Sequence, residues 1–217
     1  MLLAKQRYPT GVRPLLIEET ALRRRVEARV VEILDRERFA EVVLPIIDYA
    51  EPYAVLGDPG ARQTYRFVDR DGDLVAVRSD FTPLVARALA PALADAPLPL
   101  RVFYRGDVVR LNPPRLGRQR EMFQIGAEIV GDGSAAADSL LLSVATEAVR
   151  ALGIEPLVVC SDTDDRDSDR SYYTGLRFHI YDSAAPRIPV AQGGRYDSLY
   201  ERFGGAAPAV GFTLTID

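Results

Sequence analysis

Two long segments of the chain place hydrophobic residues at the spacing of an amphipathic helix. Residues 18–38 carry one apolar stripe, and their other faces are rich in Arg and Glu. A second stripe follows Ser134, a favoured N-cap, and stops at Gly153, a favoured helix end. The stripes consist of Leu22, Val26, Val30 and Ile33, and of Leu141, Val144, Ala148 and Leu152. Further helices are expected at residues 81–93, broken near Pro91, and at 196–203.

Short apolar runs between these helices predict strands. The Asp71-Gly72 pair between two of the runs is a hairpin signal. The runs cover residues 42–45, 65–68, 74–77, 100–104, 108–111, 122–130, 157–160, 172–181, 190–192 and 209–216. Hairpins mixed with flanking helices, without an internal repeat, predict an α+β fold with one mainly antiparallel sheet of about six or seven strands. We expect residues 1–217 to form a single domain.

The strand at residues 122–130 separates polar from apolar positions. Gln124, Gly126 and Glu128 alternate with an apolar set, so they share one face of the strand. The apolar set is Phe123, Ile125 and Ile129. A polar face is either the floor of a pocket or solvated surface, and the alternation alone does not distinguish these two interpretations.

Composition excludes several classes of function. The chain of 217 residues is 47% hydrophobic and 27% charged, with a net charge of -4, which lacks the basic balance of many nucleic-acid binders. One cysteine, Cys160, and one histidine, His179, rule out a disulfide framework and a Cys- or His-rich metal site within one chain. No apolar run has the length of a membrane span or signal peptide, so a cytoplasmic location is the default expectation.

An acidic segment at residues 161–171 invites a calcium interpretation. Asp165, Asp167 and Asp169 have the 1-3-5 spacing of an EF-hand loop. The sixth position is Arg170 instead of Gly, and the twelfth is Leu176 instead of Glu. We therefore expect a solvated loop, and no metal or cofactor site in the chain.

Arginines gather around the loop between residues 110 and 120. A fork of guanidinium groups from Arg110, Arg118 and Arg120 suits a phosphate or carboxylate. Arg110 lies between Val109 and Leu111, which favours a site over a solvated surface position.

Four segments in a fixed order resemble the catalytic core of histidyl-tRNA synthetases, a class II synthetase fold. They are Glu41-Val-Val-Leu-Pro-Ile46 (motif 1), Tyr104-Arg-Gly-Asp-Val-Val-Arg110 with Gly117-Arg-Gln-Arg-Glu-Met-Phe-Gln-Ile-Gly-Ala-Glu128 (motif 2), Tyr172-Tyr-Thr-Gly175, and Gly193-Gly-Arg-Tyr-Asp197 with Pro208-Ala-Val-Gly-Phe212. The resemblance implies a homodimer through the motif 1 helix and strand. It also implies a histidine-binding site, in which the acids hold the ammonium group, the arginine holds the carboxylate and the tyrosines bond the imidazole. Its residues would be Asp80, Thr82, Arg110, Gln124, Glu128, Tyr172 and Tyr173, with Arg118, Arg120 and Arg195 as candidate contacts for phosphate or carboxylate.

Several positions depart from the synthetase pattern. Asn112 stands where synthetases have a Glu, and Ser168 stands where they have an Arg that stabilises charge during adenylate formation. The motif 3 arginine would fall one residue past Asp217, the loop at 161–171 replaces an insertion domain, and no anticodon-binding domain is expected. Loss of such cationic groups costs orders of magnitude in rate, so we expect no catalytic residues and no tRNA partner.

These departures are similar to those of a synthetase paralogue, the regulatory subunits of ATP phosphoribosyltransferase. This second resemblance is carried by the motifs Arg78-x-Asp-x-Thr-Pro83 and Tyr104-x-Gly-x-Val-x-Arg110 and by the pair Arg120-Glu121 ahead of Gln-Ile-Gly-Ala-Glu128. It implies a non-catalytic protein that activates the short catalytic subunit and takes part in histidine feedback in histidine biosynthesis. Two alternatives stay open: a minimal histidine-activating core that uses Arg166 or Arg170 for the missing arginine, and a dimeric interaction module with a vestigial pocket.

Overall fold

The computed structural model describes residues 8–56, 63–111, 119–161 and 172–216. Its helices and 3-10 helices are α1 (Ile17–Arg36), η1 (Glu51–Leu56), α3 (Thr82–Leu89), η2 (Ala90–Ala92), α4 (Ala135–Ala151) and η3 (Tyr200–Phe203). Its strands are β1 (Ala40–Glu41), β2 (Ile47–Tyr49), β3 (Arg66–Val68), β4 (Leu74–Val77), β5 (Leu100–Val109), β6 (Glu121–Val130), β7 (Pro156–Ser161), β8 (Arg177–Asp182), β9 (Pro189–Arg195) and β10 (Ala209–Ile216).

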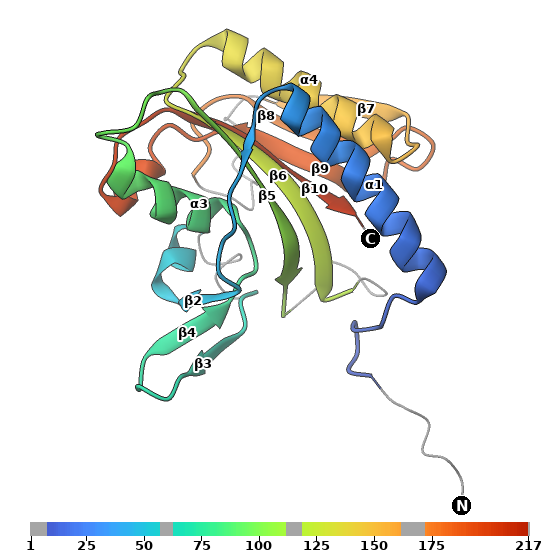
Figure 1. Ribbon diagram of the computed structural model, residues 1–217, viewed down its shortest axis with the longest axis horizontal. Coiled ribbons are helices and arrows are strands. Elements are labelled where there is room, and N and C mark those ends of the chain that lie inside the picture. Colours follow the sequence, from blue (N-terminus) through green and yellow to red (C-terminus); the bar gives the residue numbers. More distant parts are fainter. Residues whose placement is uncertain (1–7, 57–62, 112–118, 162–171, 217) are drawn as a thin grey trace, which may run out of the picture.

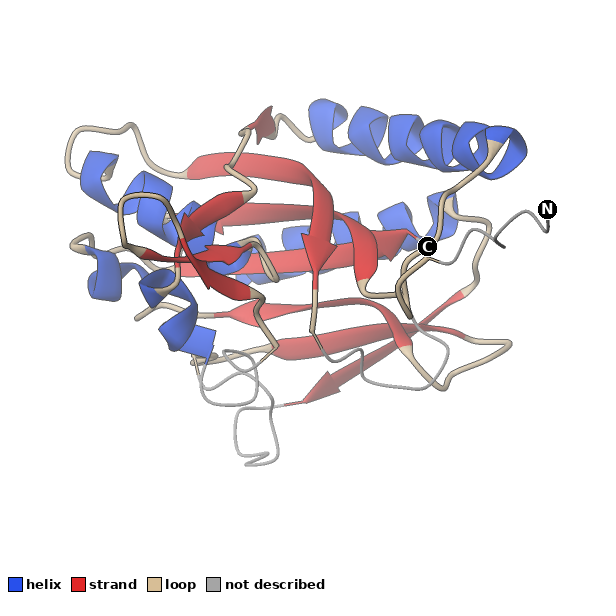
Figure 2. Ribbon diagram, turned by 90° about the horizontal axis from the view of Figure 1, so that it is seen from below, coloured by secondary structure: helices blue, strands red, loops and turns tan. Residues whose placement is uncertain are grey.

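Seven strands form the large sheet, in the order β1-β5-β6-β10-β9-β8-β7. All neighbours in it are antiparallel except β1 and β5. The predicted α+β class and mainly antiparallel sheet are therefore confirmed. A separate small sheet has the order β2-β4-β3 and contains the predicted hairpin around Gly72. Figure 2 shows the strands across the middle and lower part of the molecule, with helices above them, at the left and behind them.

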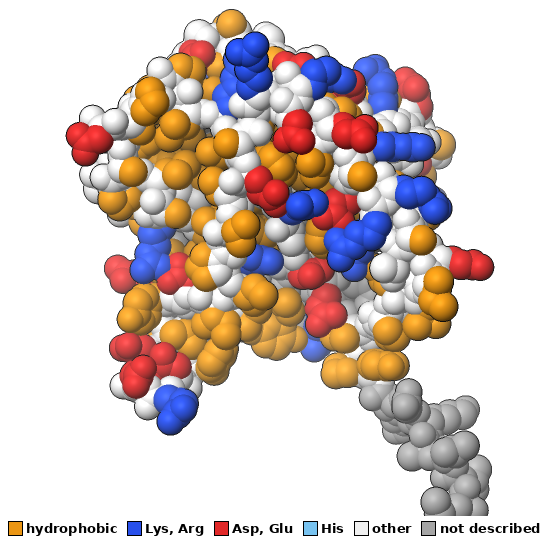
Figure 3. Space-filling model, in the orientation of Figure 1, with side chains coloured by type: hydrophobic (Ala, Val, Ile, Leu, Met, Phe, Trp, Pro, Cys, Tyr) orange, Lys and Arg blue, Asp and Glu red, His pale blue; other side chains and the backbone are white. Residues whose placement is uncertain are grey.

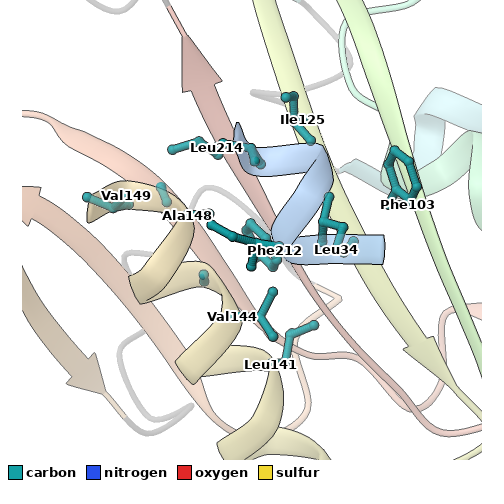
Figure 4. Packing of buried hydrophobic residues seen from close by; sticks show 14 of the residues in the cluster. Leu34, Phe103, Ile125, Leu141, Val144, Ala148, Val149, Phe212 and Leu214 are labelled. Carbon is teal, nitrogen blue, oxygen red and sulfur yellow. The ribbon is translucent and has the colours of Figure 1, made fainter. Parts of the chain in front are cut away.

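One face of the large sheet carries α1 and α4 (Figure 1). Alternate residues of a strand point to the same face, and the apolar set of β6 points to this one. There it packs against side chains of both helices. Figure 4 shows this core, which includes Leu34, Phe103, Ile125, Leu141, Val144, Phe212 and Leu214. Ser134 caps α4 as predicted, accepting from the Ala137 N–H at 3.3 Å. The opposite face of the sheet carries the polar residues of β6 together with a second buried cluster, which includes Phe81, Leu84, Tyr104 and Tyr196.

The strand predicted at residues 42–45 is wrong. The extended pairing stops at Glu41 and resumes at Ile47, with Val42 still donating its N–H to the Phe103 carbonyl at 2.8 Å. Pro45 has no N–H for a ladder, and Val43 is 90% exposed. The β-branched run therefore forms a connecting segment between the two sheets, with an apolar outer side.

Three further boundaries differ from the sequence prediction. Residues 100–104 and 108–111 belong to one strand, β5, because β6 supplies a partner for every residue from Leu100 to Val109. The strand predicted at 172–181 begins only at Arg177, since Thr174 donates its N–H to the Arg195 carbonyl outside the regular ladder. The helix predicted at 196–203 is a short 3-10 turn.

The acidic segment at 162–171 lies outside the described residues. In the described part of the chain, no helix is long and apolar enough to cross a membrane.

Candidate functional site

The polar face of β6 continues across its neighbouring strands. Glu128 lies opposite Gly211 of β10, and Gly126 lies between Tyr104 of β5 and Thr213 of β10. Because directly paired residues point to the same side of a sheet, these side chains share the face that α1 and α4 leave free. The face is enclosed, and the interpretation of these positions as solvated surface is excluded: Gln124 is 2% exposed and Glu128 is 1% exposed.

Glu128 is the centre of a cluster of hydroxyl groups. Its Oε1 accepts hydrogen bonds from the Tyr104 hydroxyl at 3.1 Å and from Thr82 Oγ1 at 3.5 Å. The Tyr104 hydroxyl also lies 3.2 Å from Thr213 Oγ1. Burial, reinforced by the charge of Glu128, raises the pKa of Tyr104 well above its usual value, so this hydroxyl stays a donor at neutral pH.

Two glycines make room for this cluster. A methyl group at Gly211 would overlap both Oε2 of Glu128 and the hydroxyl of Tyr196. A methyl group at Gly126 would overlap the hydroxyl of Tyr104. The sequence thus removes side chains at the two sheet positions where a carboxylate and a phenol must pass close to the backbone.

Asp80 and Arg110 form the charged end of the cluster. Arg110 Nη2 lies 3.7 Å from Asp80 Oδ2, and its Nε donates to the Ser79 carbonyl at 3.1 Å. Asp80 Oδ1 accepts from the N–H of Thr82 at 3.0 Å, which links the pair to the hydroxyl that reaches Glu128. The turn into α3 therefore supplies the acid Asp80 and the hydroxyl of Thr82, and the end of β5 supplies the cation Arg110.

Three tyrosines form the other end. The rings of Tyr172 and Tyr173 have centroids 5.0 Å apart, and the ring of Tyr196 meets Tyr172 edge-on at 5.8 Å. The hydroxyl of Tyr196 is buried without a hydrogen-bond partner within the described chain, and it lies beside Gly211, as Glu128 Oε2 does. These contacts join the tyrosines to the carboxylate.

The remaining predicted residues are not part of the Glu128 cluster. Gln124 shares the polar face, donates from Nε2 to Thr215 Oγ1 at 3.4 Å, and has a buried Oε1 without a partner in the described part. Arg120 donates to the Tyr65 hydroxyl at 3.0 Å. Arg118 lies outside the described residues.

Arg195 is bonded to the protein itself. It pairs with Asp138 at 2.6 Å and Asp197 at 2.9 Å, and it also donates to the Asp132 carbonyl at 3.3 Å. Burial opposes its charge, but the hydrogen bonds that it donates to these two carboxylates prevail and raise the pKa of Arg195. This arrangement differs from the predicted ligand contact, because its donors hold the start of α4 against β9.

Sequence reasoning missed Tyr104, Tyr196 and Thr213 as members of the cluster. Each reaches it through strand pairing or loop packing with segments distant in sequence. One signal was available: Gly126 between Gln124 and Glu128 indicates that a large neighbouring side chain needs the space above it.

The arrangement suits a small zwitterion that carries a ring. Glu128 and Asp80 are anionic partners for an ammonium group, and Arg110 is a partner for a carboxylate. The tyrosines supply an apolar wall with a hydroxyl group. No group of three metal-ligating side chains occurs within the described ranges.

Comparison with known proteins identifies relatives of two kinds. The model of the histidyl-tRNA synthetase family matches residues 11–161 and 166–217. The ATP phosphoribosyltransferase regulatory subunit of Symbiobacterium thermophilum is 40% identical over 149 residues, 68% of this chain and 37% of that protein. The histidine–tRNA ligase of Thermococcus kodakarensis is 34% identical over 150 residues, 69% of this chain and 34% of that protein. The chain therefore spans little more than a third of each of these relatives.

A solved structure supports the fold over nearly the whole chain. An ATP phosphoribosyltransferase regulatory subunit/histidyl-tRNA synthetase from Bacillus halodurans superposes with a TM-score of 0.86 at 20% identity. The match covers 97% of this chain and 81% of that one. At this level of identity the likeness shows the class II synthetase-like fold alone.

Proposed function

The chain belongs to the histidyl-tRNA synthetase family, and within it we propose that the chain acts as a non-catalytic regulatory subunit of ATP phosphoribosyltransferase. It would bind free histidine at the Glu128 cluster, activate the short catalytic subunit and take part in histidine feedback. A cytoplasmic location belongs to the same proposal, because a regulatory subunit shares a compartment with its catalytic subunit and with ATP.

One observation carries the ligand assignment: a carboxylate that is 1% exposed is surrounded by hydroxyl groups and connected to an acid–arginine pair. A carboxylate in so dry an environment would bind an ammonium group through strong charge-assisted hydrogen bonds. The ammonium group of histidine would supply a positive charge, and its imidazole N–H would suit the tyrosine hydroxyls. The 40% identity to a protein named as a regulatory subunit supports the choice of role.

Residues 1–217 would form a single synthetase-like core that pairs with a second copy. The segment after β1 and strand β2 support this part of the proposal, because Val43, Ile46 and Ile47 are exposed apolar residues. In α1, Leu22 is exposed as well. The predicted dimer contact through the motif 1 region thus keeps its apolar surface, although its central strand is a connecting segment.

Calorimetry with histidine tests the proposal, first on the chain alone and then with the short catalytic subunit. We expect binding in both cases, and a changed affinity in the complex, because a ligand regulates only when two states differ in affinity for it. No heat in either titration would leave only the interpretation as an interaction module.

A histidine-activating enzyme is the second candidate, favoured by the 34% identity to a histidine–tRNA ligase. Histidine-dependent exchange of pyrophosphate into ATP separates the two. The regulatory proposal predicts no exchange, with Asn112 and Ser168 in place of a Glu and an Arg. Robust exchange that is lost in Arg110→Ala would replace the regulatory function by the enzymatic one.

A further inference from the structure

Arg78 is an arginine with only 6% of its surface exposed, and it bridges two backbone segments. Its Nε donates to the Asp107 carbonyl at 2.7 Å, and its Nη1 donates to the Leu44 carbonyl at 2.9 Å. Its own backbone N–H donates to the Ile46 carbonyl at 2.8 Å. Side chain and main chain of one residue therefore fasten the segment at 44–46 from the inside.

The outer side of that segment is an apolar surface. We call Val43, Ile46 and Ile47 the outer apolar surface; they are 90%, 61% and 51% exposed. In Figure 3 hydrophobic side chains gather at the lower left, over the region where Figure 1 places β2, β3 and β4. Arg78 thus holds the inner side of a segment whose outer side is suited to a protein partner.

The other side of Arg78 leads directly to the ligand cluster. The next residue, Ser79, accepts the Arg110 Nε at its carbonyl, and Asp80 follows with its ion pair to Arg110. The Arg78 guanidinium also lies 4.4 Å above the ring of Phe81, which stacks on Tyr104, the hydroxyl donor to Glu128. Both acids of the cluster, Asp80 and Glu128, therefore depend on the position of the turn that begins at Arg78.

A planar fork is needed for this bridge. Two carbonyls on separate segments are reached by two different N–H groups of one rigid guanidinium, a geometry that the single ammonium of lysine does not reproduce. Gly106 leaves the space for it, because a methyl group there would overlap Arg78 Nη2.

We propose that Arg78 is a positioning residue that couples the outer apolar surface to the ligand cluster. A second copy of the chain that covers Val43, Ile46 and Ile47 restrains the segment at 44–46. Arg78 transmits this restraint to the turn that carries Asp80 and Thr82. The inference rests on the proposed histidine site and dimer, and it adds that the two are energetically linked. Since linkage is reciprocal, histidine should tighten dimerisation by the same factor by which dimerisation tightens histidine binding.

A double-mutant cycle with Val43→Asp and Arg78→Met tests the coupling. Val43→Asp should raise the Kd for histidine about tenfold in the wild-type background, a typical size for coupling between sites. In the Arg78→Met background the same change should raise it by less than about twofold, because the path is already cut. Two effects that simply multiply would overturn the proposal.

Three further variants separate the bridging role of Arg78 from its charge and from the general effect of removing a buried arginine. Arg78→Lys keeps the positive charge but not the fork, so it should behave like Arg78→Met; wild-type behaviour would mean that charge alone matters. Gly106→Ala displaces the guanidinium without removing it and, at a φ of +148°, also strains the backbone, so it should weaken the coupling and lower the unfolding midpoint. Arg195→Met is the matched control: Arg195 is equally buried, at 7% exposed, but bonds Asp138 and Asp197 instead of the segment at 44–46.

Hydrogen exchange supplies a measurement that needs no histidine. In a chain that keeps Arg78, Val43→Asp should speed exchange of the Thr82 N–H, which donates to Asp80 Oδ1, and leave the exchange rates of β10 unchanged. If this coupled exchange appears but calorimetry shows no histidine binding, the proposed ligand fails and the coupling stands. Faster exchange confined to residues 42–47, or no change at all, would overturn the coupling itself.

Discussion

The two sheets of this protein distribute polar and apolar side chains in opposite ways. The large sheet buries an acid, Glu128, at 1% exposed, whereas the small sheet exposes Tyr49 at 48% and Phe67 at 43%. Each arrangement is costly for an isolated chain: the first because a buried charge loses its hydration, the second because apolar area stays in water. The difference supports the two partners proposed above, a small charged ligand for the large sheet and a protein surface for the small one.

Glu128→Ala should have the largest effect, and it bears directly on the buried side of this comparison. Removing one member of a buried charge pair costs about 2–5 kcal/mol, so the Kd for histidine should rise by at least about tenfold. The matched control is Glu121→Ala, at the exposed start of the same strand, which should leave the Kd unchanged. Calorimetry measures both; equal binding by wild type and Glu128→Ala would remove histidine from this site.

Gly211→Ala sharpens the same point by filling the space that the carboxylate uses. The added methyl group would overlap Glu128 Oε2 and the Tyr196 hydroxyl, and such overpacking costs about 1–3 kcal/mol of unfolding free energy. Gly133→Ala is the control, because its methyl group would meet Pro208 at an ordinary 3.5 Å. Urea denaturation should show a lower midpoint for the first variant only. A midpoint equal to wild type would mean that Glu128 moves without cost.

Ile47→Asp tests the exposed side of the comparison. A charge at the centre of an apolar interface should weaken dimerisation by about 1–2 kcal/mol, roughly five- to thirtyfold. Val68→Asp is the control: Val68 is more exposed, but it pairs with Leu74 and so points to the other face of the small sheet from Ile47. Sedimentation over a concentration series measures both. A wild-type protein that stays monomeric at micromolar concentration would refute the dimer and leave the apolar surface to another partner.

The sequence pattern predicted correctly those elements whose own residues alternate or repeat regularly. The alternation around Gln124 and Glu128 identified β6 and its two faces, because a period of two is unambiguous over ten residues. The gap predicted inside β5 was wrong, since Arg105, Gly106 and Asp107 look like a break until β6 supplies their ladder partners. The segment at 42–45 misled for the opposite reason: its β-branched residues signal a strand, but no neighbouring strand pairs with them beyond Val42.

The site was harder to predict than the fold. Six predicted residues (Asp80, Thr82, Arg110, Glu128, Tyr172 and Tyr173) come together in one connected cluster, and the family resemblance was what selected them. Tyr104 and Thr213 were missed because strand register, which a single sequence does not specify, brings them to Glu128. Tyr196 was missed because it reaches the cluster from the loop after β9. Arg195 illustrates the converse, since a conspicuous arginine in a recognisable motif is bonded to the protein's own carboxylates.

The smallest expected effect is a pH dependence that appears only in alkaline solution. Burial, followed by the charge of Glu128, raises the pKa of Tyr104 and of Tyr200 above the ordinary value of 10.0. A folded-state pKa above the unfolded one means that the folded protein holds the proton more tightly. The resulting stability is fully present below pH 10 and is lost as the pH rises beyond it. Between about pH 6 and 9 both tyrosines are protonated in the folded and the unfolded chain, so they should not make the stability depend on pH there. Thermal melting from pH 8 to about 11 should therefore show Tm falling above pH 10 in the wild type, and falling less in Tyr104→Phe. Equal slopes for the two proteins would show that Tyr104 ionises as easily in the folded chain as in the unfolded one, and that the large sheet does not enclose its polar face as tightly as its burial indicates.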